Sequence, residues 1–305
     1  MSGTALILGA SGRFGRHMSA AFWNAGWTVR PYRRGTDDLM QCAKGADVIV
    51  HGWNPPYTDW VDEVPVLTRR VIEAAKISDA TVVVPGNVYV FGKDAAKQLS
   101  EHTKHNASNP LGRIRIEMEA TFRASGVRTI LLRGGDFIDD AAAGNWFDRI
   151  MIKGLHKGRL TYPGALDVPH SWAWLPDLAA AAVKLAEQRA YLSCFEDVPF
   201  PGYTLTGHEL AAVLSDRIGR PVRARRMSWL PLWIARPFWP MARHLLEMRY
   251  LWSKPHRLDD TKFARLLPDF RMTRVGDALS LAVRQNVDPD QPMSDRARAR
   301  RRAVI

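Results

Sequence analysis

The chain has 305 residues, of which 46% are hydrophobic and 24% charged, as in ordinary globular proteins. No apolar run reaches the roughly 20 residues of a membrane-spanning helix, and Cys42 and Cys194 are too few for a disulfide framework or a thiolate metal cluster. The first residues lack a basic and apolar leader, so we expect a soluble cytoplasmic protein with one main domain and an appended lobe.

The net charge of +12 is concentrated in two segments. Residues 220–249 hold seven arginines against Glu247, and residues 291–305 hold five against Asp295. We interpret 291–305 as a disordered, solubilising basic tail, because a charge block without apolar periodicity does not fold alone. Contact with an acidic partner is the alternative, and no nucleic-acid partner is expected.

Apolar runs and helical patterns alternate along the first half of the chain. The run 4–8 leads into glycines and then into a helical pattern that Gly26 ends. Further strands are expected at 28–33, 46–50, 80–84 and 127–132, and helices at 59–76 and 113–125. This alternation predicts an α/β fold with a doubly wound, parallel, Rossmann-type sheet and right-handed crossovers.

The alternation of strand and helix patterns becomes irregular after Arg133, apart from a helix expected over 176–189. We therefore assign 1–140 and 168–192 to the dinucleotide-binding domain, and 141–167 and 193–290 to a smaller substrate lobe. Residues 229–252 are rich in tryptophan and arginine but contain Pro231, Pro237 and Pro240. These prolines favour an irregular packed lid over the alternative, an interfacial membrane helix.

The glycines of LILGASGRFG carry the strongest chemical signal. Gly9 permits a tight turn, Gly12 lets the backbone approach a pyrophosphate, and Gly15 lets helix and strand pack closely. A strand before the glycines and a helix after them place a helix N-terminus toward the phosphates. The predicted phosphate-binding turn comprises Gly9, Ser11, Gly12, Arg13, Phe14 and Gly15.

The end of the second strand bears on the choice between NAD and NADP. An acid there holds the ribose hydroxyls of NAD, whereas an arginine accepts the extra phosphate of NADP. The strand leads into Arg33 and Arg34, and no acid follows before Asp37. The sequence therefore favours NADP, with NAD as the alternative if these are only surface arginines.

Residues 4–285 resemble the short-chain dehydrogenase/reductase superfamily, in its extended class, and more narrowly its atypical NAD-dependent epimerase/dehydratase-like subgroups. The resemblance rests on six stretches: GASGRFG, ADVIVHGWNPP, VVVPGNVYVFG, NPLGRIRIEMEA, VPHSWAWLPDLAAAAVKLAE and LDDTKFARLLPDF. It implies a nicotinamide cofactor, with Trp53 and Asn54 of the second stretch beside it.

The resemblance also implies a Ser or Thr, a Tyr and a Lys, in which the tyrosine exchanges a proton and the lysine holds the ribose. These positions are occupied by Asn87, Leu111 and Arg115. Leucine cannot exchange a proton, whereas Arg115 can still bind ribose hydroxyls. A second departure is that residues 34–47 are too few for the additional strand, and its aspartate, that the family normally has there.

Four side chains are candidates to replace the absent tyrosine. Tyr89 shares a side of the strand with Asn87, Tyr57 follows the third strand, and Asp136 and His170 fall where the family lines its substrate cleft. We favour Asn87, Tyr89 and Arg115 as the catalytic set. A metal site at His102 and His105 is not favoured, because no partner stands at ligand spacing.

Three functions remain open at this point. The first is an oxidoreductase or epimerase-like enzyme that acts on a small carbonyl or sugar-like substrate through a displaced acid, as a monomer or homodimer. The second is an NADP-binding sensor without turnover. The third is a membrane- or nucleic-acid-associated protein that depends on its arginine-rich segments.

Overall fold

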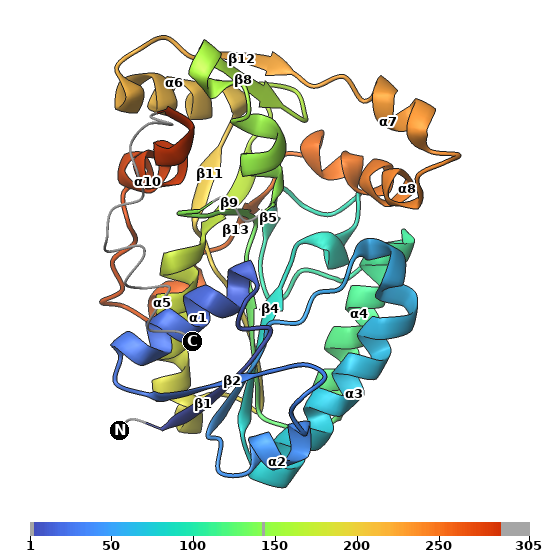
Figure 1. Ribbon diagram of the computed structural model, residues 1–305, viewed down its shortest axis with the longest axis vertical. Coiled ribbons are helices and arrows are strands. Elements are labelled where there is room, and N and C mark those ends of the chain that lie inside the picture. The colour runs from blue at the N-terminus through green and yellow to red at the C-terminus, as the bar shows by residue number, and fades with distance from the viewer. Residues whose placement is uncertain (1–2, 142–143, 288–305) are drawn as a thin grey trace.

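A six-stranded parallel sheet forms the centre of the molecule in a computed structural model that describes residues 3–141 and 144–287 (Figure 1). The strand order is β10-β6-β4-β3-β1-β2, so the chain reverses direction across the sheet between β1 and β3. The strands are β1 (Thr4–Leu8), β2 (Thr28–Tyr32), β3 (Val48–His51), β4 (Thr81–Gly86), β6 (Thr129–Arg133) and β10 (Phe195–Pro199). The predicted fold class is confirmed.

Helices cover both faces of this sheet, because each crossover between parallel strands must return over one face. Helices α1 (Arg13–Asn24) and α5 (Leu175–Glu187) pack together on one face. On the other face lie α2 (Leu39–Ala43), α3 (Trp60–Ser78) and α4 (Pro110–Ala124). Two apolar cores result, one between each helical layer and the sheet.

The remaining elements form a smaller lobe beyond the carboxyl ends of the strands (Figure 1). It contains the three-stranded sheet β11-β9-β7, the pair β12-β8, the pair β13-β5 and a core of its own. Its strands are β5 (Gln98–Leu99), β7 (Asp136–Ile138), β8 (Arg159–Tyr162), β9 (His170–Trp174), β11 (Tyr203–Leu205), β12 (Arg223–Arg226) and β13 (Arg257–Leu258).

Further helical segments complete the two parts of the molecule. The α-helices are α6 (Gly207–Ile218), α7 (Leu230–Ala235), α8 (Pro240–Glu247), α9 (Thr261–Leu266) and α10 (Val275–Val287). Short turns of tighter or wider helix are η1 (Tyr57–Asp59), η2 (Tyr89–Phe91), η3 (Phe147–Met151), η4 (Leu155–Lys157), η5 (Arg189–Tyr191) and η6 (Met248–Trp252).

Strand β10 corrects the predicted boundary between residues 192 and 193. This segment was assigned to the substrate lobe, yet it pairs with β6 as the edge of the central sheet. Its sequence, FEDVP, does not look like a buried strand because it carries two acids. Glu196 is paired with Lys262, and Asp197 with Arg133, so both carboxylates can be buried.

Two other expectations from the sequence can be compared with the structure. Only the short helix α2 lies between residues 34 and 47, so β2 is the sheet edge and the additional strand is absent there, as expected. The segment 229–252 forms α7, α8 and η6. The packed-lid expectation is wrong for α7 and the loop after it, whose large apolar side chains are exposed, and right for the packing of η6, whose Met248, Leu251 and Trp252 are buried. Among the described residues, no helix is long and apolar enough to cross a membrane. The predicted tail, 291–305, lies outside the described residues.

Candidate functional site

The glycine turn between β1 and α1 leaves a helix N-terminus open. Gly9 adopts a φ of 74°, in the left-handed region, and its carbonyl accepts a hydrogen bond from Gly12 N–H at 2.9 Å. Among the described residues no side chain caps the first turn of α1, and no acid lies in that turn. Ser11 and Gly12 are exposed. The free N–H groups and the helix dipole therefore suit an anion such as a phosphate.

The glycines at this turn and after β3 differ in how closely the backbone packs against them. A Cβ on Gly15 would lie 2.1 Å from the Gly9 carbonyl oxygen, so any side chain there would push α1 off the turn. A Cβ on Gly12 would lie 3.2 Å from the same oxygen, with ordinary φ, so this carbonyl would have to shift by a few tenths of an ångström to accept one. Gly52, after β3, is packed about as closely as Gly15, because a Cβ there would lie 2.4 Å from the Leu8 carbonyl oxygen.

The two arginines after β2 differ in their partners. Arg34 places its guanidinium 3.0 Å from a carboxylate oxygen of Glu63, on α3. Arg33 is exposed, and within the described part of the chain only its backbone is engaged: its N–H donates to the Asp37 carboxylate at 2.7 Å, and its carbonyl accepts from Asp37 N–H at 3.1 Å. The Arg33 guanidinium is thus the freer of the two to meet an anion.

Arg115 of α4 reaches the end of β3. Its guanidinium donates to the Asn54 side-chain oxygen at 2.8 Å and lies 4.2 Å from the centre of the Trp60 ring. Burial lowers the pKa of Arg115, while nearby Tyr89 and Glu119 oppose that change. Trp53, from the same loop as Asn54, packs edge-on against Tyr32 at 5.5 Å. These residues connect α4 with the strand ends.

Two tyrosines meet beside Arg115. The hydroxyls of Tyr57 and Tyr89 are 2.7 Å apart and form a hydrogen bond. Burial raises the pKa of Tyr89 well above its ordinary value, and Tyr57 raises it further. Burial also raises the pKa of Tyr57. Both phenols therefore stay protonated at neutral pH, which makes them hydrogen-bond donors and poor bases.

Leu111 lies in the core, 1% exposed, one helical turn before Arg115. Its backbone N–H and the Asn109 side-chain amide both donate to one carboxylate oxygen of Glu247, at 2.7 and 2.8 Å. This contact attaches the end of α8 to the start of α4. A Cβ on Gly112 would lie 2.9 Å from the Tyr89 carbonyl oxygen, so this glycine lets α4 approach the tyrosine segment closely.

Asn87 uses its side-chain oxygen to fix the local backbone. That oxygen accepts the Tyr89 N–H at 3.0 Å, a turn that leaves the amide nitrogen of Asn87 as a potential donor. Arg133 holds the Asn87 carbonyl at 2.6 Å. The Arg133 guanidinium is fully buried between Glu119 and Asp197, at 2.8 and 2.6 Å. This ion network supports the carboxyl end of β4.

A carboxylate and an imidazole pair at the border of the lobe. The Asp136 carboxylate accepts a hydrogen bond from His170 Nε2–H at 2.7 Å. His170 is 1% exposed and stacks flat on Trp252 at 4.3 Å, whereas the Asp136 side chain is 24% exposed. Asp136 therefore presents the accessible group of this pair, and His170 fixes its position.

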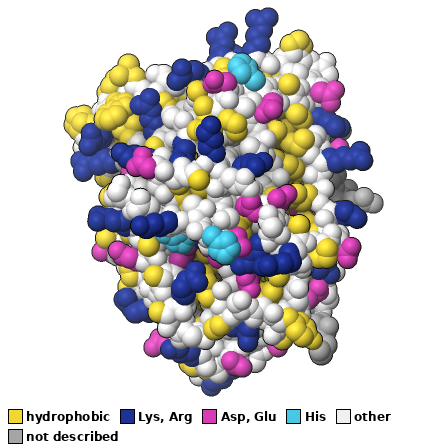
Figure 2. All heavy atoms as spheres, turned by 180° about the vertical axis from the view of Figure 1, so that it is seen from behind, with side chains coloured by type: hydrophobic (Ala, Val, Ile, Leu, Met, Phe, Trp, Pro, Cys, Tyr) yellow, Lys and Arg dark blue, Asp and Glu magenta, His cyan; other side chains and the backbone are white. Residues whose placement is uncertain are grey.

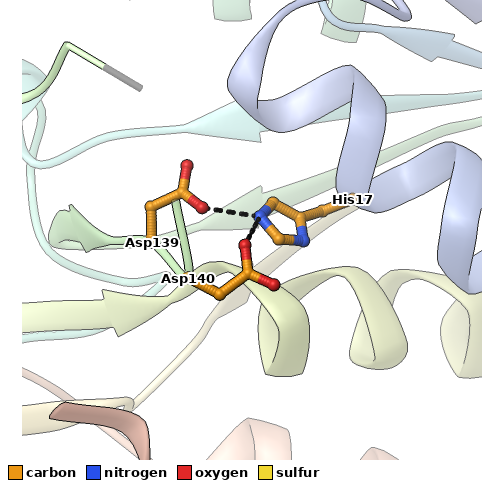
Figure 3. A group of neighbouring side chains, drawn as sticks. All are labelled: His17, Asp139 and Asp140. Carbon is orange, nitrogen blue, oxygen red and sulfur yellow. Dashed lines mark hydrogen bonds and ion pairs between the residues drawn. The ribbon is translucent and has the colours of Figure 1, made fainter. Parts of the chain in front are cut away.

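One further cluster joins α1 to the loop after β7 (Figure 3). Both carboxylates, of Asp139 and Asp140, approach the Nε2 atom of His17, at 2.9 and 3.5 Å. The guanidinium of Arg16 already bonds Asp139 and lies 3.4 Å from Asp140, so a cation is in place without a metal. Similarly, His105 lies 3.7 Å from Glu119, whose charge Arg133 balances.

Comparisons with known proteins show the fold. No protein-family model matches the chain, and no curated protein matches its sequence. The structure is similar to MoeE5 in complex with UDP-glucose and NAD (TM-score 0.73, 17% identity), over 92% of this chain and 98% of that one. It is also similar to UDP-glucuronic acid 4-epimerase from Bacillus cereus in complex with UDP-glucuronic acid and NAD (TM-score 0.72, 15% identity, 93% and 98% covered). A nucleoside-diphosphate-sugar epimerase from Pseudomonas aeruginosa, PA4631, gives a TM-score of 0.69 at 16% identity, over 95% and 99%.

The structure brings together four of the residues that the sequence singles out: Tyr57, Tyr89, Arg115 and Asn54 form one group. Leu111 lies with its side chain in the core. Sequence reasoning missed Gly52, Gly112, Trp60 and Glu247. Gly52 and Gly112 are glycines because the backbone of another segment approaches each of them closely. For Gly52, the one indication in the sequence was a glycine directly before an aromatic loop. Nothing local in the sequence indicates that Glu247 contacts α4, 136 residues away.

Proposed function

We propose that this chain is a nicotinamide-dinucleotide-dependent enzyme of the epimerase/dehydratase type, acting on a sugar-like or carbonyl substrate. The observation that carries the proposal is the hydrogen-bonded pair of Tyr57 and Tyr89 beside Arg115, at the carboxyl edge of the sheet. The fold likeness to structures described as holding NAD and a UDP-sugar supports a nucleotide sugar as the first substrate class to test.

The residues present fit a dinucleotide. The uncapped N-terminus of α1, with N–H groups of Arg13 and Phe14, would hold the pyrophosphate, and the absence of a Cβ on Gly12 leaves room for it. Arg115 and Asn54 would hold the ribose near the nicotinamide. When bound, the nicotinamide ring supplies hydride acceptance and donation.

A preference for NADP over NAD remains part of this proposal. It rests on Arg33, whose guanidinium is not fixed by an ion pair in the described chain. The similar structures named above hold NAD, so the two cofactors must be compared directly.

Tyr89 is the acid in this proposal. Its protonated phenol can donate to a substrate oxygen, and Tyr57, which is half-buried and reprotonated by solvent, can return a proton through the 2.7 Å hydrogen bond. The raised pKa keeps Tyr89 protonated before the reaction and also makes it a weaker acid than an ordinary tyrosine. The accessible carboxylate of Asp136, fixed by His170, is the base candidate for removing a proton from the substrate.

The test is a Tyr89→Phe variant assayed with nucleotide sugars, aldehydes and ketones. Epimerisation is followed by separating the products, and reduction by nicotinamide absorbance. Removal of a general acid costs about two to four orders of magnitude in turnover. Tyr57→Phe serves as the matched control, because it removes the partner phenol and keeps Tyr89; we expect a smaller loss. An unchanged rate in Tyr89→Phe would rule out this phenol as the acid.

A dinucleotide-binding sensor without turnover is the second candidate. The buried Leu111 at the usual tyrosine position and the raised pKa of Tyr89 favour it, since neither provides a ready base. Absence of turnover across the whole panel, together with intact cofactor binding, would support this candidate. A small-molecule ligand, a monomeric or homodimeric state and a cytoplasmic location stay predictions.

A further inference from the structure

Five large apolar side chains are exposed on α7 and the adjoining loop. They are Leu230 (63% exposed), Trp233 (46%), Ile234 (66%), Phe238 (89%) and Trp239 (47%), and we call them the α7–α8 tip. Figure 2 shows hydrophobic side chains gathered at the upper left, at the end of the molecule where these helices lie. These side chains are not used for packing within the protein, and a contiguous exposed apolar group of this size is typical of an interaction surface.

Arginines surround the tip. Between residues 220 and 249 the only acid is Glu247, and its carboxylate is turned inward to the start of α4. All the following arginines are exposed: Arg223, Arg225 and Arg226 on β12, and Arg236, Arg243 and Arg249 in the segment that forms the tip and α8. Dark blue side chains border the hydrophobic group in Figure 2. The surface therefore combines exposed apolar side chains with positive charge.

An open pocket lies directly beside the tip. It has a volume of about 290 Å³, and its lining includes Arg226, Arg249 and Ser253 as well as the tip residues Leu230 and Trp233. The Arg249 guanidinium lies 5.6 Å from the ring centre of Trp229, another lining residue. Neither arginine forms an ion pair within the described part of the chain. Two unpaired guanidinium groups and a hydroxyl suit a phosphate group.

We propose that the α7–α8 tip docks on a membrane surface that contains anionic phospholipid. Trp233, Ile234 and Phe238 enter the boundary between headgroups and acyl chains, and a lipid phosphate occupies the pocket of Arg226 and Arg249. Exposed aromatic and aliphatic side chains flanked by arginines are the combination that binds such interfaces. This inference does not depend on the proposed enzyme function.

Charge and apolar exposure distinguish an anionic membrane from two other occupants, a second copy of the chain and a nucleic acid. In a two-fold contact between copies, the same arginines would face one another with no exposed acid in the segment to balance them. A nucleic acid would use the arginines but would offer no apolar phase for Ile234 and Phe238, which are 66% and 89% exposed. An anionic membrane satisfies both kinds of side chain.

The test is co-sedimentation of the full chain with vesicles of phosphatidylcholine alone and of phosphatidylcholine mixed with phosphatidylglycerol. We expect wild type to bind the anionic vesicles preferentially. A Trp233→Ser, Ile234→Ser, Phe238→Ser variant should bind them at least about tenfold more weakly, since three apolar side chains that would enter the membrane are lost. Arg226→Gln with Arg249→Gln should lose the preference for the anionic vesicles.

Matched controls separate the tip from general surface effects. Trp23→Ser with Tyr191→Ser removes side chains that are 62% and 91% exposed elsewhere, and Arg265→Gln with Arg271→Gln removes the same charge from another surface. Both should bind like wild type. The proposal would be overturned if the serine variant bound the anionic vesicles like wild type, or if wild type formed a lipid-free dimer that the serine substitutions dissociated. It would also be overturned if the arginine variant lost binding to duplex DNA but kept its preference for anionic vesicles.

Discussion

Arg33 and Arg34 are neighbours, but only Arg34 has its guanidinium in an ion pair, with Glu63. If the NADP proposal holds, Arg33→Ala should weaken NADP binding about ten- to a hundredfold and leave NAD binding unchanged, since a hydrogen bond to a charged group contributes roughly 1.5–3 kcal/mol. Arg34→Ala is the matched control with a smaller effect. Calorimetric titration of both cofactors measures the difference; equal affinities for NAD and NADP in wild type would contradict the preference.

That Leu111 stands where the resemblance implies a tyrosine is a prediction from the sequence, and the surroundings of Leu111 could not be predicted. Leu111 is visibly unable to exchange a proton, whichever fold surrounds it. Its burial and the contact of its N–H with Glu247 depend on how α8 returns to α4. The same holds for Tyr57 and Tyr89, whose hydroxyls meet although the residues are 32 positions apart.

The attachment of α1 to the loop after β7 depends on Asp139. Burial alone would raise the pKa of this carboxyl, but hydrogen bonds and charge from His17 and Arg16 outweigh burial and hold the pKa at about 2. The ordinary value is about 3.9. A lowered folded-state pKa stabilises the fold at pH values above the unfolded value, and the stabilisation is lost as pH falls toward the folded value.

Asp139→Asn should therefore reduce the free energy of unfolding by about 2 kcal/mol at neutral pH, and by roughly half as much at pH 3. Urea unfolding of wild type and variant at both pH values measures this. The neighbouring Asp140→Asn is the control: burial raises the pKa of Asp140, so its loss should not destabilise the protein at neutral pH. An Asp139→Asn effect that is equal at both pH values would contradict this explanation.

The prolines of residues 229–252 explain why the expectation for that segment was only partly right. Pro231 lies in the first turn of α7, and Pro240 opens α8. Proline is tolerated in a first turn because its missing N–H has no helical partner there. The prolines thus begin helices in this segment, and the predicted irregular structure is limited to the connection between them.

The central sheet was predictable because its strands and helices alternate, and each strand ends near its expected residue. Strand order and the place of β10 required more, since the two acids of FEDVP are stabilised by Arg133 and Lys262 from distant parts of the chain. The glycine turn was predictable for the opposite reason: backbone geometry and close approach are set within a few residues. Contacts between the lobe and the sheet, such as that of Glu247, leave no local pattern.

The central claim, that a nicotinamide dinucleotide binds at the start of α1, is tested most directly by titrating NAD and NADP into wild type and Gly12→Val by calorimetry. A Cβ at Gly12 needs only a shift of a few tenths of an ångström in the Gly9 carbonyl, so circular dichroism of the variant should match wild type, while the valine side chain fills the space that the pyrophosphate needs. Ala25→Val, at the exposed other end of α1, is the matched control and should bind normally. We predict binding of a dinucleotide by wild type and by Ala25→Val, and none by Gly12→Val; a folded Gly12→Val protein with wild-type affinity would contradict the account.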